Sequence, residues 1–74
     1  MATTKLDLKG MSCPMPIMKM AAAVKKGTSG DVFEAVCDDA GFEPDVLAWC
    51  KETGNKLDNL TKSGKDITVV ITKK

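Results

Sequence analysis

The 74-residue sequence contains no histidine and no tyrosine, and all of its 11 basic residues are lysines. Without histidine the chain lacks the commonest general base, the commonest metal ligand and any cysteine–histidine nucleophile pair. Its aromatic residues are Phe33, Phe42 and Trp49, which are too few for a base-stacking surface. Any chemistry in this chain must therefore use a cysteine thiol without the help of a histidine imidazole.

Charge and hydropathy exclude two further classes of protein. The lysines are spread along the chain and the formal net charge is +1, whereas nucleic-acid binders usually carry a concentrated basic face. The longest apolar run is too short to span a bilayer, and the first eight residues lack the apolar segment of a signal peptide. We therefore expect one domain over residues 1–74, cytoplasmic and monomeric, with no direct contact with nucleic acid or membrane.

The three cysteines, Cys13, Cys37 and Cys50, cannot all be paired within the chain. With no export signal, we expect them to be thiols in a reducing compartment. No two of them have the CxxC spacing, which argues against a thioredoxin-like dithiol.

Hydrophobic periodicity predicts alternating strands and helices, followed by a hairpin. This order predicts an α+β fold, a two-layer α/β sandwich in which a four-stranded mixed sheet has both helices packed on one face. The polar residues that alternate through the strands indicate that the other face meets water. The predicted elements are a strand over 5–9, a helix over 16–26, a strand over 31–37, a helix over 42–53, and hairpin strands over 56–62 and 66–72.

The second predicted helix has a clear inward stripe and a candidate cap. Its inward stripe consists of Val46, Trp49, Cys50 and Thr53. Asp38 and Asp39 precede it and offer an N-cap, because a side-chain oxygen can accept a hydrogen bond from the free N–H groups of a first turn. We note a second possible role for this pair, orienting residues around Cys13, since strand ends and helix starts gather in such a fold.

The stretch "GMSCPMPIM" places a cysteine next to two prolines at the start of the predicted first helix. Proline is tolerated in the first turn of a helix because the N–H groups there have no partner within the helix. If Cys13 is the cap, Pro14 is the first helical residue; alternatively, regular helix begins only at Pro16, because a residue before proline avoids helical backbone. In either case the prolines fix the direction of the thiol. The positive end of the helix dipole favours a thiolate there.

This stretch resembles the CPxP signature of the TusA/SirA/YedF family of small sulfur-carrier proteins. The similarity continues through "GDVFEAVCDD" and "DVLAWCKETGN" into the closing hairpin. Family members often have Asp-Asp-Pro before the second helix, whereas this chain has Ala40 and Gly41 after the aspartates. The resemblance covers nearly the whole chain and implies a single TusA-like domain.

The resemblance implies a sulfurtransferase that carries sulfane sulfur as a persulfide on Cys13, with Pro14 and Pro16 as positioning residues. It implies a sulfur-donor protein, a cysteine desulfurase or a rhodanese, and a sulfur-acceptor protein of the DsrE or TusD type. The destinations in the family are tRNA thiolation, molybdenum-cofactor synthesis and sulfur oxidation, and some relatives accompany selenium metabolism. Such transfer resembles thiol–disulfide exchange and requires no metal and no cofactor.

The remaining cysteines and the methionines permit other interpretations. We expect Cys37 and Cys50 to be structural. Thioether and thiolate ligands suit Cu(I), so a copper carrier is an alternative function for Cys13 and its neighbouring methionines. A regulatory interaction module without chemistry is another alternative. In the sulfur-carrier interpretation, four apolar residues are candidates for partner docking, namely Met11, Met15, Met18 and Trp49.

Overall fold

The computed structural model describes residues 3–12 and 15–74. Strands and helices follow one another in the order β-α-β-α-β-β, as the sequence predicts. The bounds are β1 Thr3–Asp7, α1 Met15–Lys26, β2 Val32–Cys37, α2 Phe42–Thr53, β3 Lys56–Ser63 and β4 Asp66–Thr72.

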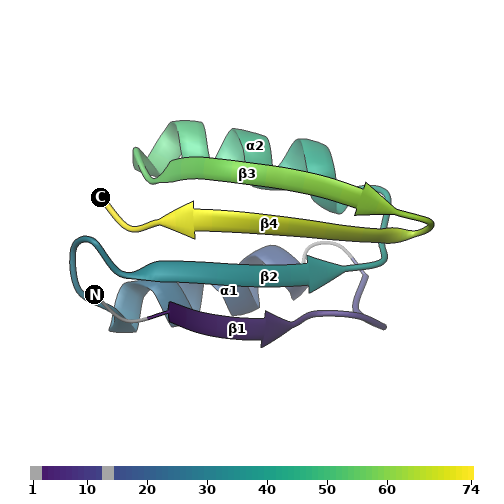
Figure 1. Cartoon of the computed structure of the whole chain (residues 1–74), viewed down its shortest axis with the longest axis horizontal. Helices are drawn as coiled ribbons and strands as arrows, with labels where there is room; N and C mark the ends of the chain where they lie inside the picture. The colour runs from purple at the N-terminus through teal and green to yellow at the C-terminus, as the bar shows by residue number, and fades with distance from the viewer. Residues whose placement is uncertain (1–2, 13–14) are drawn as a thin grey trace.

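The strands form one four-stranded mixed sheet in the order β1-β2-β4-β3. Strands β1 and β2 run parallel, and both are followed by a helix that returns the chain to the starting edge (Figure 1). Strand β4 enters between β2 and β3 and is antiparallel to both. Because β1 and β2 are parallel, their carboxyl ends lie at the same edge of the sheet, where the segment leading to Cys13 begins.

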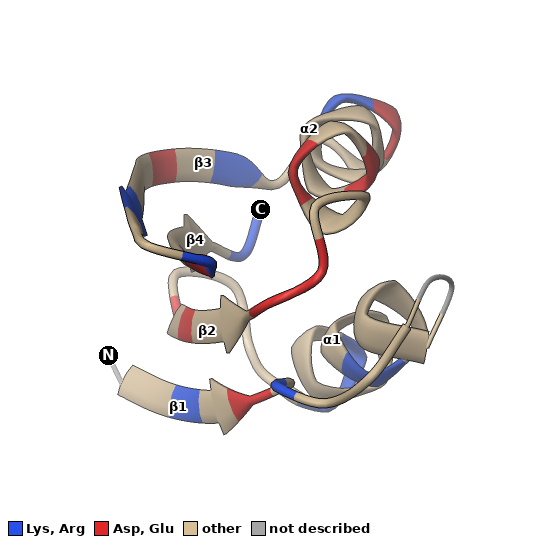
Figure 2. Ribbon diagram, turned by 90° about the vertical axis from the view of Figure 1, so that its right-hand side faces the viewer, with Lys and Arg blue, Asp and Glu red and all other residues tan. Residues whose placement is uncertain are grey.

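Both helices cover the same face of the sheet, which makes the molecule a two-layer sandwich (Figure 2). The alternation in β2 and β4 explains this, because every second residue is buried against the helices. The predicted α+β fold is therefore confirmed. The buried hydrophobic residues are Leu8, Met20, Val24, Phe33, Ala35, Cys37, Phe42, Val46, Cys50, Ile67, Val69 and Ile71.

The carboxyl end of α1 is held by a lysine that is distant in sequence. The Lys73 ammonium donates hydrogen bonds to the carbonyl of Gly27 at 2.8 Å and to that of Lys25 at 3.3 Å. These carbonyls belong to the end of the helix, where a cation is favoured. The sequence indicates Lys25 and Lys26 for that role, and the fold adds Lys73, which directly follows the last strand.

The start of α2 corrects one prediction. Its N-cap is Gly41, and no side chain makes a cap hydrogen bond, so the prediction that Asp38 or Asp39 caps this helix is wrong. The two residues after the aspartates form a turn that separates them from the helix. In this turn the Gly41 N–H donates to the Asp39 carboxylate at 3.3 Å, and the Phe42 N–H donates to the Asp39 carbonyl at 3.0 Å.

The inward stripe of α2 is also shorter than predicted. Val46 and Cys50 are buried and Trp49 is half-buried against the core, but Thr53 is exposed. Thr53 lies in the last turn, where its hydroxyl donates to the Trp49 carbonyl at 2.8 Å. Among the helices in the described part of the chain, none is long and apolar enough to cross a membrane.

Candidate functional site

Cys13 and Pro14, predicted to be the persulfide bearer and a positioning residue, lie outside the described residues. The residues on either side of them are described. The Met15 N–H donates to the Ser12 carbonyl at 3.0 Å, so the described residues on the two sides of the pair are in contact. Helix α1 begins at Met15, between the two starting points that the proline pattern allows.

Pro16 anchors the beginning of α1 in the core. Its side chain is among the largest that are fully buried, and it occupies the second residue of the helix. Proline loses no hydrogen bond at this position, because the first N–H groups of a helix have no intrahelical acceptor. The chain therefore enters α1 at a point that is fixed by packing, three residues after Cys13.

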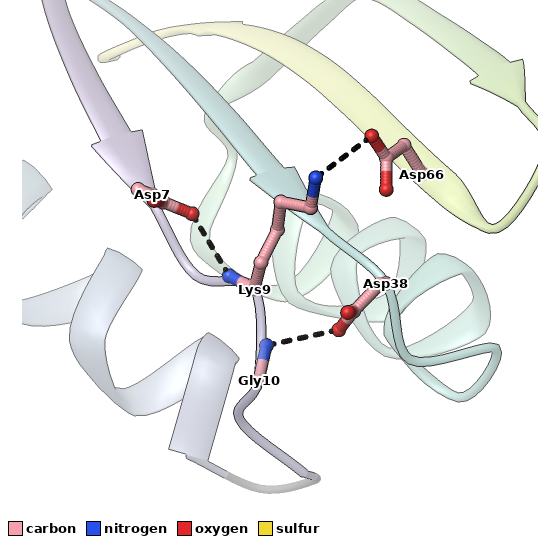
Figure 3. Close-up of polar contacts among 5 residues, drawn as sticks. All are labelled: Asp7, Lys9, Gly10, Asp38 and Asp66. Atoms are coloured by element: carbon pink, nitrogen blue, oxygen red, sulfur yellow. Dashed lines mark hydrogen bonds and ion pairs between the residues drawn. The ribbon is translucent and has the colours of Figure 1, made fainter.

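The segment before Cys13 is fixed by contacts with two strands (Figure 3). Beyond β1, the Leu8 N–H donates to the Val36 carbonyl at 2.8 Å, which continues the pairing with β2. The chain then turns at Gly10, where φ is +81°, a conformation that favours glycine. The Gly10 N–H donates to the Asp38 carboxylate at 3.0 Å.

Lys9 adds two contacts to the same turn (Figure 3). Its N–H donates to the Asp7 carboxylate at 3.1 Å, and its ammonium forms an ion pair with Asp66 at 3.1 Å. The hydrogen bond with Asp66 is the main cause of the raised pKa of Lys9. Both side chains of this ion pair are exposed to solvent, so the pair contributes little to stability.

Sequence reasoning missed Lys9, Gly10 and Asp66 as parts of this site. The only local signal is Gly10, which follows a predicted strand and precedes the cysteine. The sequence suggests Asp38 and Asp39 as residues that orient the Cys13 segment, and the structure brings Asp38 into contact with the residues before Cys13 through Gly10.

The methionines near Cys13 divide into two groups. Met15 is 44% exposed and Met18 is 59% exposed, which is unusual for large hydrophobic side chains. Met11 is half-buried and packs against the core, and Met20 is fully buried. The exposed pair thus lies on the first two turns of α1, close in sequence to Cys13.

Trp49 lies apart from these methionines. Together with Ala21, Lys25 and Lys74 it lines a groove of about 550 Å³ between the second halves of α1 and α2. Since Met15 and Met18 lie in the first half of α1, the structure does not combine the four predicted docking residues into one surface.

Cys37 and Cys50 are free thiols in the core. Burial raises the pKa of both, and for Cys37 hydrogen bonds from the backbone of Asp39 and Asp38 act in the opposite direction without overcoming it. A buried, protonated thiol is a poor nucleophile. Neither residue therefore has the properties of a sulfur-transfer site.

The described residues contain no group of three histidine, cysteine, aspartate or glutamate side chains that could hold a metal ion.

The sheet order and the two helices on one face define a small α+β sandwich that is known from a solved structure. The crystal structure of a SirA-like protein from Desulfitobacterium hafniense matches with a TM-score of 0.77 at 25% sequence identity, and the match covers 97% of this chain and 96% of that chain.

The family is shown by comparison of sequences. The family described as "Sulfurtransferase TusA" matches residues 4–73, so the chain belongs to that family. "Putative sulfur carrier protein" from Aquifex aeolicus is 38% identical over 66 residues, which are 88% of this chain and 34% of that protein. "Sulfur carrier protein TusA" from Allochromatium vinosum is 32% identical over 69 residues, which are 93% of this chain and 91% of that protein. The resemblance inferred from the sequence is thereby confirmed.

Some relatives are much longer than this chain. It spans 34% of the Aquifex protein and 30% of "Putative sulfur carrier protein YrkF" from Bacillus subtilis. It spans 79% of "Putative sulfur carrier protein YrkI" from the same organism, over a region of 39% identity.

Proposed function

We propose that this protein is a cytoplasmic, monomeric sulfur carrier that accepts sulfane sulfur on Cys13 and passes it to another protein. The observation that carries the proposal is the family match over residues 4–73, in a chain whose CPxP cysteine precedes a helix anchored by the buried Pro16. The other two cysteines are buried in the core, where a partner's thiol has no access to them.

The transfer needs two nucleophilic steps and no cofactor. In the first, the Cys13 thiolate attacks the outer sulfur of a persulfide on the donor, the sulfur–sulfur bond of the donor breaks, and the donor leaves as a thiolate. In the second, a thiolate of the acceptor attacks the outer sulfur of the Cys13 persulfide. The sulfur–sulfur bond on Cys13 breaks, and Cys13 is left as a thiolate. One sulfur atom moves in each step, and no electrons are gained or lost overall.

The helix start supplies the electrostatic support. Backbone N–H groups in the first turn of α1 have no intrahelical acceptor and favour an anion beside them. The first turn of α1 contains no acidic residue that would oppose this effect. A lowered thiol pKa at Cys13 follows and increases the thiolate fraction at neutral pH.

The partners follow from this chemistry. A donor must present a persulfide, as a cysteine desulfurase or a rhodanese does, and an acceptor of the DsrE or TusD type must present a thiolate. Met15 and Met18 are the docking residues that we favour, because they are exposed and flexible and lie next to Cys13 in the sequence. Sulfur delivered in this way serves tRNA thiolation, molybdenum-cofactor synthesis or sulfur oxidation.

A loading experiment tests the proposal. The protein is incubated with a cysteine desulfurase plus cysteine, or with a rhodanese plus thiosulfate, and its peptides are examined by mass spectrometry without reduction. We expect one additional sulfur atom on the peptide that contains Cys13, and its transfer to an acceptor as labelled sulfur.

Three variants serve as comparisons in that experiment. Cys13→Ser should abolish loading, whereas Cys37→Ala and Cys50→Ala should load like the wild type. Wild-type protein that binds Cu(I) stoichiometrically but takes up no sulfur would support the copper alternative instead. An activity that survives Cys13→Ser would indicate an interaction module.

A further inference from the structure

The loop from β1 to Cys13 is held by residues that are distant in sequence. Leu8 is buried and continues the pairing with β2, so the chain is fixed up to that residue. Gly10 then reverses the chain direction with φ at +81°. Only Met11 and Ser12 separate this turn from Cys13 in the sequence.

The contact between Asp38 and Gly10 ties the backbone of this turn to the residue that follows β2. The carboxylate accepts the Gly10 N–H at 3.0 Å across 28 positions of sequence. Hydrogen bonds to a charged acceptor are stronger than those between neutral groups. Within the turn the Met11 N–H also donates to the Leu8 carbonyl at 3.4 Å, and Lys9 adds one contact to the neighbouring Asp7 and one through its exposed side chain.

Asp38 is itself attached to a rigid part of the fold. It follows Cys37, which is fully buried at the end of β2 and paired with Ile67 of β4. The Asp38 side chain is short, so its carboxylate holds the Gly10 turn at a fixed place relative to the central strands β2 and β4 (Figure 3).

We propose that Asp38 is a positioning residue for Cys13, which acts by accepting the Gly10 N–H and thereby holding the loop before the thiol in register with the start of α1. The consequence for sulfur transfer rests on the proposed function. On the far side, the Met15 N–H binds the Ser12 carbonyl and Pro16 is buried in the core. Asp38 thus supplies one of two anchors between which Cys13 lies in the sequence.

The charge of Asp38 and its hydrogen bond to Gly10 should have opposite effects on the reactivity of Cys13. A carboxylate close to a thiol disfavours the thiolate, so its charge alone would make Cys13 less reactive. If the loop positions the thiol beside the free N–H groups at the start of α1, as the proposal requires, the thiolate is favoured and Cys13 is more reactive. The two effects are separated by Asp38→Asn, which keeps an acceptor oxygen, and Asp38→Ala, which does not. Both variants are neutral at this position.

The test compares these two variants in the full chain by alkylation with iodoacetamide. The rate at each cysteine is followed by peptide mass spectrometry from pH 5 to 10. We expect the apparent pKa of Cys13 to be higher in Asp38→Ala than in Asp38→Asn. We also expect sulfur transfer to an acceptor to be about tenfold slower in the alanine variant, with the asparagine variant close to the wild type. Equal behaviour of the two variants would overturn the proposal.

Two internal controls distinguish positioning from loss of structure. Cys37 and Cys50 are buried, so their alkylation reports opening of the fold in the same sample. Both should remain as slow as in the wild type. If their rates rise in parallel with the change at Cys13, Asp38 supports the fold in general and the positioning role is refuted.

A matched variant, Asp39→Ala, removes the same charge from the next residue. Asp39 contacts Gly41 at the start of α2, and we expect its removal to leave the pH profile of Cys13 unchanged. A shift equal to that of Asp38→Ala would assign the effect to the loop charge and overturn the proposal. If the wild type takes up no sulfur, the proposed function fails, but the alkylation profiles still decide whether Asp38 positions the thiol.

Discussion

Replacing Pro16 with alanine should destabilise the protein by about 2 kcal/mol. The side chain is fully buried, and the substitution deletes two methylene groups at about 0.8 kcal/mol each. The greater freedom of the unfolded chain adds about 0.4–1 kcal/mol. The gain in helix propensity is small, because proline is well tolerated in a first turn.

A loss of this size is large for a chain of this length. Domains of about 74 residues have a free energy of unfolding of about 4–11 kcal/mol, so the variant should remain folded. The midpoint of its thermal unfolding should fall by about 8–16 °C. Urea unfolding followed by the fluorescence of Trp49, which is the single tryptophan and is half-buried, measures the change directly. Sulfur loading of Cys13 should also slow at temperatures where Pro16→Ala is fully folded, because the start of α1 loses its anchor.

The matched control is Met18→Ala on the same helix. Met18 is 59% exposed, and its replacement should change the free energy of unfolding by less than about 0.5 kcal/mol. The reasoning is refuted if Pro16→Ala unfolds at the same urea concentration as the wild type, or if the two variants lose equal stability.

Two further predictions concern the core. Gly27→Ala should lower the free energy of unfolding by about 1–3 kcal/mol in thermal or urea unfolding, because the added Cβ would lie 2.6 Å from Cζ of Phe33. In the control Gly41→Ala the added Cβ meets no atom closer than 3.6 Å, so the loss should be smaller. Equal losses in the two variants would contradict the steric argument. The free energy of unfolding should fall as the pH rises above about 8.5, the ordinary pKa of a thiol. Burial raises the pKa of Cys37 and Cys50, so both thiols stay protonated in the folded state at a pH where they ionise in the unfolded state. Urea unfolding at pH 7 and 9.5 measures this slope, which should be smaller in a variant with alanine at both positions; an unchanged slope would point to other groups.

The sequence by itself determined the order of the elements, the composition of the core and the candidate thiol. Alternation in 31–37 and 66–72 assigns a face to each residue, because side chains in a strand point alternately to opposite sides. The start and end of α2 at Phe42 and Thr53 agree with the prediction, since Gly54 adopts the positive φ that ends a helix. These signals are local, and each can be evaluated within a few residues.

The tertiary structure decided what distant segments do to one another. No local pattern places β4 between β2 and β3, brings Lys73 to the end of α1 or joins Asp38 to Gly10. Asp38 looks like a helix cap in the sequence because aspartate before a helix usually has that role. In the structure a turn over Ala40 and Gly41 separates it from α2, and its carboxylate accepts the N–H of Gly10 in the loop after β1. The physical reason is that a hydrogen bond across 28 residues depends on the path of the whole chain, whereas burial periodicity depends only on the geometry of one element.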